Sequence, residues 1–392
     1  MTEFSFFNPV RLFFGAGAFD RLGEHAAAWG ARALLVTGRS AARKSGLLDR
    51  AVSVLDGAGV AVTLFERIMP NPTAAVVDEG AALAREQGCD VVVAVGGGSA
   101  MDAAKAIACC AAEGAPAADF LRLEGKREPS ADTLPLICAT TTSGTSSELT
   151  PFAVVTVEEW TQKSAIRSDH IYPKVAIVDP EVTLTCPPGV TAAVGVDVLA
   201  HAIEGYFSTA ASPITDACSE RAIELVARNL PRAVEDCGDL TARDAMARAN
   251  VFAGYTLSNA GASVLHALEH PISAYRPEIA HGAGLAAMLV TYAERYFDHD
   301  PWRFGRIAKL MGRGVPGAPT EQSAEFAADA IRALLSSVGL DIRLADLGVE
   351  RDEIETIVDD AMRYMAGAIA KTPGDLTRAD LIALLEASFS RD

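Results

Sequence analysis

The chain has 392 residues, 50% of them hydrophobic, and a mean hydropathy of +0.20, a composition that excludes a mostly disordered protein. Its 51 acidic residues outnumber 34 basic ones, and the resulting net charge of −17 repels nucleic-acid phosphates and anionic membranes. We therefore expect no nucleic-acid or membrane partner, in a chain long enough for two domains.

The cysteines and the first residues indicate the compartment. Seven cysteines are present, an odd number without any C-x-x-C spacing, which favours reduced thiols. The opening MTEFSFFNPVRLFFG has an acidic residue at position 3 and no basic stretch before an apolar core, so we expect no signal peptide. The most apolar stretch, residues 91–112, contains glycines, Asp102 and Lys105, which is not typical of a membrane span. These features predict a cytoplasmic protein.

Short apolar runs alternate with helical patterns in the first half of the chain. Residues 31–38, 89–98, 134–142 and 172–180 are rich in β-branched side chains, and the first two runs end in glycine, as buried parallel strands often do. The Ala-rich residues 74–88 between them have helical spacing. This alternation predicts an α/β fold with a parallel sheet.

The pattern changes after Pro188. Beyond it, β-branched runs become rare and amphipathic helical patterns dominate, for example in residues 323–339 and 379–389. We therefore expect two domains, an α/β domain over residues 1–188 and an all-helical domain over residues 189–392.

A glycine-rich turn follows the strand predicted over residues 89–98. The sequence VVVAVGGGSAMDAAK places Gly97 and Gly98 between this strand and a helix. Glycines let the backbone approach a ligand, and a helix N-terminus favours a pyrophosphate. The turn is neither G-x-G-x-x-G nor a P-loop, so a tight turn without a ligand stays open. The hydroxyl-rich residues 139–150 follow another strand, where an open α/β sheet binds its ligand, although ordinary loops also contain such residues.

Histidines and a carboxylate form a second pattern. Three of the seven histidines, His266, His270 and His281, lie within sixteen residues, and His201 follows Asp197 by one helical turn. The i, i+4 spacing places Asp197 and His201 on one helix face, and His266 and His270 on another. Imidazoles with a carboxylate and without thiolates suit Fe²⁺ or Zn²⁺. HALEH lacks the glutamate of the H-E-x-x-H metalloproteases, and core or surface histidines without a metal remain the alternative.

Six motifs together resemble one family. In their order and separation the chain resembles the iron-containing, or group III, alcohol dehydrogenases over nearly its whole length. The resemblance implies a dehydroquinate synthase-like architecture, in which the α/β domain binds the coenzyme and the helical domain is the metal-binding, catalytic domain. The motifs are MPNPT (69–73), GGGSAMDAAK (96–105), TTSGTSSELT (141–150), DPEVT (179–183), GVDVLAHAIEGY (195–206) and HALEH…HG (266–282).

The resemblance also implies roles for single residues. The four metal ligands of the family match Asp197, His201, His266 and His281, and a histidine implicated in proton transfer beside the substrate matches His270. The coenzyme positions of the family match Gly97, Gly98, Ser99 and Asp102 in the diphosphate loop, Thr141, Thr142, Thr145 and Ser147 in the hydroxyl loop, Lys163 and Val182 along the cofactor, and Asn71 on the adenine side.

Three features depart from the family pattern. The interval from His270 to His281 is one residue longer than in the commonest members, and Arg276 within it could face the substrate. Leu257 stands where an aromatic residue is expected, which would enlarge the pocket. Thr140 replaces a usual proline, and the sequence offers no interpretation of it. Arg276 and Leu257 point to a substrate larger or more anionic than ethanol, such as an acid- or phosphonate-bearing aldehyde.

The segment VTGRSAARKSG bears on the choice of coenzyme. NAD-preferring relatives have an acidic residue near Gly38, which would repel a 2′-phosphate. Here Gly38 and Ser40 lie among Arg39, Arg43 and Lys44, and this basic, hydroxyl-bearing loop favours NADP(H) over NAD(H). An ordinary solvated helix start is the alternative.

The resemblance implies reversible hydride transfer between a nicotinamide coenzyme and a small aldehyde or primary alcohol. Ligand type does not separate Fe²⁺ from Zn²⁺ at such a site. The alternatives are a polyol (glycerol or diol) dehydrogenase, a dehydroquinate synthase-like lyase on the same fold, and a binding protein without turnover. Family members commonly form dimers, so we expect a homodimer or a larger homo-oligomer.

Overall fold

The computed structural model describes residues 3–390, which form two compact units. One unit is Asn8–Cys186, and the other consists of residues 3–7 together with residues 187–390. The division thus lies close to the expected boundary at residue 188, whereas residues 3–7 group with the helical part of the chain. The coenzyme-binding and metal-binding roles of the two domains stay predictions.

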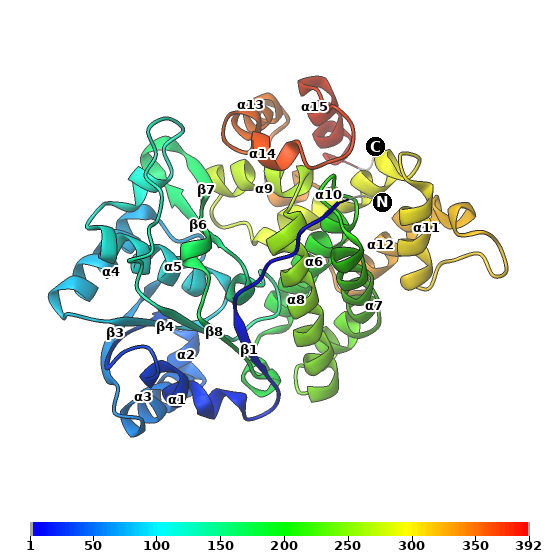
Figure 1. Cartoon of the computed structure of the whole chain (residues 1–392). Coiled ribbons are helices and arrows are strands. Elements are labelled where there is room, and N and C mark those ends of the chain that lie inside the picture. The colour runs from blue at the N-terminus through cyan, green and yellow to red at the C-terminus, as the bar shows by residue number, and fades with distance from the viewer. Residues whose placement is uncertain (1–2, 391–392) are drawn as a thin grey trace. The chain divides into compact units, whose positions relative to one another are not determined.

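The α/β unit contains one six-stranded sheet in which every neighbouring pair is parallel (Figure 1). The strand order across the sheet is β1-β8-β5-β4-β2-β3. The strands are β1 (Arg11–Phe14), β2 (Arg32–Gly38), β3 (Ala61–Ile68), β4 (Val91–Gly96), β5 (Leu136–Thr140) and β8 (Val175–Val178). The α-helices of this unit are α1 (Leu22–Ala27), α2 (Ala41–Lys44), α3 (Leu47–Gly57), α4 (Ala74–Glu86) and α5 (Gly98–Glu113).

Both faces of the sheet are covered by helices. Leu34 and Val92 point into the core shared with α4 and α5, whereas their chain neighbours Leu35 and Val93 point into the core shared with α1 and α3. Because successive side chains of a strand alternate between faces, a strand buried on both sides must be apolar throughout. This explains the continuous apolar runs in the sequence.

The predicted fold class, a parallel α/β sheet followed by a helical region, is confirmed. The four predicted strands correspond to β2, β4, β5 and β8, and the predicted helix over residues 74–88 corresponds to α4. The structure adds the edge strands β1 and β3, and an antiparallel hairpin of β6 (Phe152–Val157) and β7 (Gln162–Arg167).

The strand order creates a switch point beside β2. The chain continues from β2 to β3 on one side of it and from β3 to β4 on the other. In open α/β sheets, ligands bind outside the carboxyl ends of the strands at such a point. Gly38 ends β2, Gly96 ends β4 and Thr140 ends the next strand, β5, so the glycine-rich and hydroxyl-rich segments both leave the sheet at this edge.

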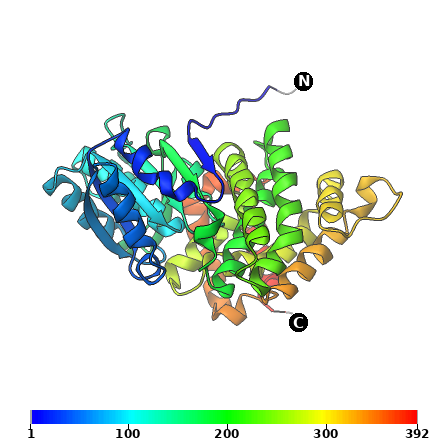
Figure 2. The same cartoon turned by 90° about the horizontal axis from the view of Figure 1, so that it is seen from below.

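The second unit is helical. Helices α6, α7 and α8 lie side by side, as Figures 1 and 2 show in green. Phe7 N donates a 2.8 Å hydrogen bond to Asn259 Oδ1 of α8, which holds residues 3–7 on this unit. Its α-helices are α6 (Pro188–Tyr206), α7 (Pro213–Glu235), α8 (Leu240–Ala260), α9 (Val264–Tyr275), α10 (His281–Tyr296), α11 (Pro301–Leu310), α12 (Phe326–Ser337), α13 (Ile354–Tyr364), α14 (Ala366–Ile369) and α15 (Arg378–Ala387).

Helix α6 lies in the interior of this unit. It packs against α7, α8, α9 and α10, so it is apolar around nearly its whole circumference. Its charged residues are two buried acids, Asp197 and Glu204. Across residues 3–390, none of the helices is both long and apolar enough to cross a membrane.

Candidate functional site

Asp197 and His201 lie one turn apart on α6 and are both buried. His201 Nδ1 lies 3.5 Å from Asp197 Oδ1, so the two side chains face the same point, as the i, i+4 spacing predicts. Among the described residues, His201 Nδ1 has no hydrogen-bond partner. A buried nitrogen of this kind is available to a ligand.

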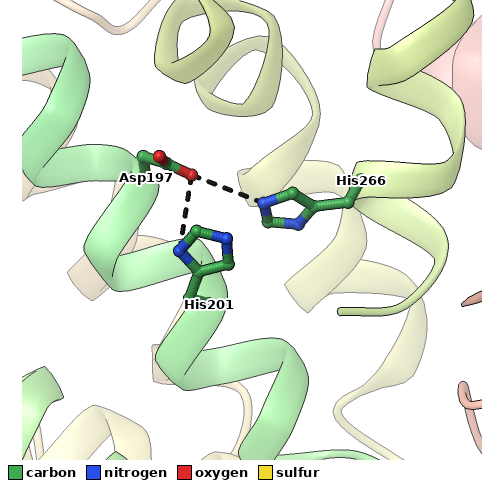
Figure 3. Close-up of side chains that lie close together, drawn as sticks. All are labelled: Asp197, His201 and His266. Atoms are coloured by element: carbon green, nitrogen blue, oxygen red, sulfur yellow. Dashed lines mark hydrogen bonds and ion pairs between the residues drawn. The ribbon is translucent and has the colours of Figure 1, made fainter. Parts of the chain in front are cut away.

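Two further histidines reach the same carboxylate oxygen. His266 on α9 and His281 at the start of α10 place their Nε2 atoms 3.4 and 3.8 Å from Asp197 Oδ1. Figure 3 shows the side chains of Asp197, His201 and His266 converging. The rings of His201 and His266 are stacked, with their centroids 4.4 Å apart. Three imidazoles from three helices therefore surround one carboxylate oxygen.

These distances fit a divalent metal ion. Ligand atoms about 2.1 Å from a tetrahedral ion lie about 3.4 Å from one another, close to the 3.4–3.8 Å separations around Asp197 Oδ1. The donor set of one carboxylate and three imidazoles suits Fe²⁺ or Zn²⁺. Asp197, His201 and His266 also form one of the two groups of potential metal ligands in the described chain, and the other group comprises Glu269, His270 and His281.

The electrostatics of the cluster favour a cation. Burial raises the pKa of the Asp197 carboxyl, but the facing His201, His281 and His266 outweigh it and hold that pKa well below its usual range. Burial lowers the pKa of His201 to about 4, which keeps its imidazole neutral. Burial acts in the same direction on His266, but Glu204 and Asp197 raise its pKa to about 10. A metal ion must therefore displace a proton from His266.

Two buried carboxylates contact the Nδ1 atoms of His266 and His281, on the side of each ring away from Asp197. Glu204 on α6 contacts His266 Nδ1 and also accepts hydrogen bonds from Leu265 N at 2.7 Å and Ser263 Oγ at 2.8 Å. Glu269 on α9 contacts His281 Nδ1 in the same way. Sequence analysis missed both glutamates, although a lone acid in an apolar helix, such as Glu204 in LAHAIEGY, is a usable signal.

His270, the predicted proton-transfer residue, lies one turn beyond His266 on α9 and is buried. The centre of its ring lies 5.7 Å from that of His281. It therefore borders the cluster of metal candidates. Its role in proton transfer stays a prediction from the family resemblance.

The two predicted substrate-side residues have different surroundings. Arg276 caps the C-terminal end of α9, and its Nη2 donates a 2.8 Å hydrogen bond to Glu353 Oε2. This pairing neutralises the guanidinium that sequence analysis offered to an anionic substrate. Leu257 is buried on α8.

The predicted coenzyme residues gather mainly at the carboxyl edge of the sheet. The glycine-rich and hydroxyl-rich turns touch each other there, since a Cβ at Gly97 would lie 3.0 Å from Thr142 Oγ1, and one at Gly98 would collide with Thr145. Thr140, unexplained by sequence, donates to the Thr142 carbonyl oxygen at 2.8 Å and so shapes the second turn. Residues at or just after strand ends at this edge are Gly38, Ser40, Asn71, Gly97, Gly98, Ser99, Thr141, Thr142, Thr145 and Val182.

Three predicted coenzyme residues lie farther into the unit. Asp102 and Ser147 are buried and bound to each other, with Ser147 Oγ donating to Asp102 Oδ1 at 2.5 Å. Lys163 is buried in β7, opposite Thr156 of β6. Thr156 N in turn donates to the Pro72 carbonyl oxygen, which ties the hairpin to the segment after β3.

Comparison with known proteins gives the family of the chain. Residues 9–180 match the family "Iron-containing alcohol dehydrogenase", and residues 191–389 match "Fe-containing alcohol dehydrogenase family, C-terminal". Alcohol dehydrogenase 4 of Schizosaccharomyces pombe is 37% identical over 94% of this chain and 85% of its own length.

Two solved structures are similar over the full length. An archaeal halo-thermophilic alcohol dehydrogenase from a Red Sea brine pool is 39% identical, with a TM-score of 0.96 over 99% of this chain and 100% of its own. Sulfoacetaldehyde reductase of Bifidobacterium kashiwanohense, solved in complex with NAD⁺, is 31% identical, with a TM-score of 0.88 and full coverage of both chains. The chain belongs to the iron-containing alcohol dehydrogenase family, oxidoreductases whose membership implies a divalent metal and a nicotinamide coenzyme.

Proposed function

We propose that the protein is a metal-dependent alcohol dehydrogenase, or aldehyde reductase, that transfers hydride between NAD(P)H and a small aldehyde or primary alcohol. The observation that carries the proposal is the placement of three imidazole nitrogens 3.4–3.8 Å from Asp197 Oδ1. A buried carboxylate surrounded by three histidines has little use in a purely structural role, because burying such groups costs stability.

Asp197, His201, His266 and His281 would hold the ion, Fe²⁺ or Zn²⁺. When bound, the ion supplies a Lewis acid that polarises the substrate oxygen. Asp197 provides the negative charge of the site. Glu204 fixes the ring of His266, because a carboxylate on Nδ1 leaves Nε2 free for the ion.

His270 would move the proton. The nicotinamide coenzyme, when bound, would supply or take up the hydride. His270 would donate a proton to the substrate oxygen in the reduction and would accept it back in the oxidation. The position of His270 beside His281 supports this role.

The coenzyme would lie at the carboxyl edge of the sheet. Gly97, Gly98 and Ser99 would take the diphosphate, and the hydroxyls of Thr141, Thr142 and Thr145 would contact the coenzyme next to it. Asn71 would lie on the adenine side, and Lys163 and Val182 farther along the cofactor. Asp102 and Ser147 belong to the same site.

We propose NADP(H) as the preferred coenzyme. Gly38 leaves no carboxylate at the end of β2, and the exposed Arg39 and Lys44 add positive charge there. One acid does reach this loop from β3, since Arg43 Nη2 donates to Glu66 Oε2 at 2.8 Å. The proposed preference therefore depends on the segment that follows β2 and on Glu66 of β3.

The substrate class is a small aldehyde or primary alcohol. An anionic aldehyde is a second candidate, favoured by the likeness to a sulfoacetaldehyde reductase. Because Glu353 already binds Arg276, an anionic group would need a different cation. We also propose a cytoplasmic location, in keeping with the seven free thiols. We further propose a homodimer or a larger homo-oligomer, as the family resemblance implies.

The test measures NADPH and NADH oxidation by chelator-treated protein with uncharged and anionic short aldehydes, before and after anaerobic addition of Fe²⁺ or Zn²⁺. We expect turnover only with metal, faster with NADPH, and continuous net consumption of coenzyme. Consumption of coenzyme distinguishes a dehydrogenase from a dehydroquinate synthase-like lyase, which regenerates it, and glycerol and 1,3-diols in the oxidation direction test a polyol dehydrogenase.

The variant Asp197→Ala should lose metal and turnover while it keeps coenzyme binding. Asp375→Ala, which removes an exposed aspartate of the helical unit, is the matched control and should keep all three. An Asp197→Ala protein with unchanged metal content would refute the ligand assignment.

A further inference from the structure

We propose that Lys105 is a positioning residue of the coenzyme site, which holds the hydroxyl-rich turn against the glycine-rich turn through Ser147 and Asp102. The inference rests on the proposed coenzyme function of these two turns. It assigns a role to Lys105 and gives Asp102 and Ser147 a role that does not require contact with the coenzyme.

Lys105 is a fully buried cation on α5, two turns from the glycine-rich turn. Its Nζ donates to the Phe152 carbonyl oxygen at 2.6 Å, to Ser147 Oγ at 2.8 Å and to Thr150 Oγ1 at 3.3 Å. All three acceptors lie on the segment from the hydroxyl-rich turn to the start of β6. The three donors of an ammonium group are thus directed to one stretch of chain.

Asp102 completes the arrangement one turn earlier on α5. Its Oδ1 accepts from Ser147 Oγ at 2.5 Å and lies 3.9 Å from Lys105 Nζ, while its Oδ2 accepts from Val154 N at 3.1 Å. Both carboxylate oxygens therefore bind the same segment that Lys105 binds. The side chain of Asp102 is only 12% exposed, so its contacts are within the protein.

The contacts continue from this pair to the two turns. Ser147 N donates to Thr145 Oγ1 at 3.2 Å, and Thr145 lies so close to Gly98 that a Cβ there would collide with it. Lys105, Ser147, Thr145 and Gly98 thus form an unbroken series from the interior of α5 to the proposed diphosphate loop. Displacing Ser147 would move Thr145, and with it the wall of that loop.

The chemistry of the pair favours a positioning role over a stabilising one. Burial lowers the pKa of Lys105 and raises the pKa of Asp102, because both charged forms lose hydration. A buried ion pair is often no more stable than apolar residues of similar volume. Such a pair instead fixes the position of the segment that it binds, because each donor and acceptor has a defined partner.

The test uses coenzyme affinity and thermal stability as separate readouts in Lys105→Met and in Lys105→Met/Asp102→Asn. The single variant leaves Asp102 as an unpaired buried charge, so both stability and affinity should fall. Adding Asp102→Asn removes that charge and should recover part of the melting temperature. Affinity should not recover, because Ser147 and Thr150 still lack their cation. Lys126→Met, at an exposed lysine of the same unit, is the matched control.

We expect the dissociation constant for NADPH, measured by titration calorimetry well below the melting temperature, to rise about tenfold in both variants, since small displacements of binding groups have effects of this size. Metal content should not change, because the metal candidates lie in the other unit. Recovery of affinity in step with stability in the double variant, or affinity within twofold of wild type in either, would overturn the inference.

A milder variant tests the same inference if Lys105→Met does not fold. Thr150→Val keeps the volume of a buried side chain and removes one acceptor of Lys105. It should raise the dissociation constant about threefold, the effect of one modest hydrogen bond, and an unchanged constant would contradict the proposal. If the wild type binds neither NADPH nor NADH, the proposed function itself is refuted. If the wild type binds coenzyme and the variants bind it equally well, only the role of Lys105 is refuted.

Discussion

Glu204 contacts Nδ1 of His266, while Nε2 of the same ring faces the Asp197 carboxylate at 3.4 Å. One edge of the imidazole is thus held by an outer carboxylate, and the other is directed into the candidate metal site. Glu269 holds His281 in the same manner. Such outer carboxylates fix the tautomer and orientation of metal-binding histidines.

Glu204→Gln should weaken metal binding. The amide keeps the shape of the side chain but loses the charge that orients His266. Its NH₂ group would replace a carboxylate oxygen and face groups that donate hydrogen bonds to Glu204. We expect the metal dissociation constant to rise about 10- to 100-fold, measured by competition with a chromophoric chelator. Glu321→Gln, at an exposed glutamate, should leave it unchanged. Equal affinities for the two variants would show that Glu204 only fills space.

Gly282 lets α10 lie close to α6, because glycine has no Cβ. A Cβ at this position would collide with the Ala193 carbonyl oxygen, which is backbone and cannot turn away. Gly282→Ala should therefore displace the adjoining His281, lower the stability by about 1–3 kcal/mol as overpacking does, and reduce metal affinity.

The control for Gly282→Ala is Gly367→Ala on α14, where a new Cβ meets nothing within 4 Å. It should be neutral or slightly stabilising, since alanine favours a helix over glycine. Thermal unfolding with and without metal gives both quantities. A Gly282→Ala protein as stable as the control would mean that α10 shifts freely.

Local spacing predicted those parts of the site that lie within one helix. Asp197 with His201 follows from their i, i+4 separation, and the strand-to-turn positions of Gly97 and Thr141 follow from the apolar runs before them. The convergence of His281 on Asp197 depends on how α10 packs against α6, which no local pattern encodes. Family resemblance, not periodicity, assigned His281 to the ligands.

Local sequence patterns also could not predict ion-pair or strand partners that come from distant segments of the chain. The sequence presents Arg276 as a free cation, and only the fold brings Glu353 to it. Glu66 reaches Arg43 because β3 lies beside β2 in the sheet. The edge strand β1 was missed because RLFF is four residues long and gains its partner from β8, far along the chain.

A pH dependence follows from Glu220 on α7. Its carboxylate accepts from Tyr206 Oη at 2.8 Å and from Arg306 Nη2 at 2.7 Å. Burial raises the pKa of Glu220, but these bonds and the nearby arginines lower it below 4.5 overall. Because the folded pKa is below the unfolded one, the stabilisation is present above about pH 4.5 and is lost as the pH falls through the folded value.

Glu220→Gln should therefore cost about 1–2 kcal/mol of unfolding free energy at pH 7 and progressively less below pH 4.5, as measured by urea unfolding across this range. Glu224→Gln is the comparison, since its partners Arg221 and Arg228 are largely exposed, and such pairs contribute less than about 1 kcal/mol. A cost that is constant down to pH 3 would rule out a contribution from the charge of Glu220.

The choice of coenzyme should respond to Glu66. Its carboxylate accepts hydrogen bonds from Arg43. With NADP(H) bound as proposed above, this pairing would compete with the 2′-phosphate for the guanidinium. Glu66→Gln should free Arg43 and raise the ratio of kcat/KM for NADPH over NADH about three- to tenfold, the effect of about one charge-assisted hydrogen bond. The gain should shrink with added salt, because both side chains are exposed.

Two variants make this prediction specific to the position of Glu66. Glu79→Gln breaks another exposed ion pair of the same unit, with Arg67, and should leave the coenzyme ratio unchanged because it removes the same charge elsewhere. Arg43→Ala should lower the ratio and abolish the effect of Glu66→Gln in the double variant, since the two changes act through one guanidinium. If Glu66→Gln raised the ratio equally with and without Arg43, the cause would be the loss of a negative charge near the phosphate, and Arg43 would have no part in coenzyme selection.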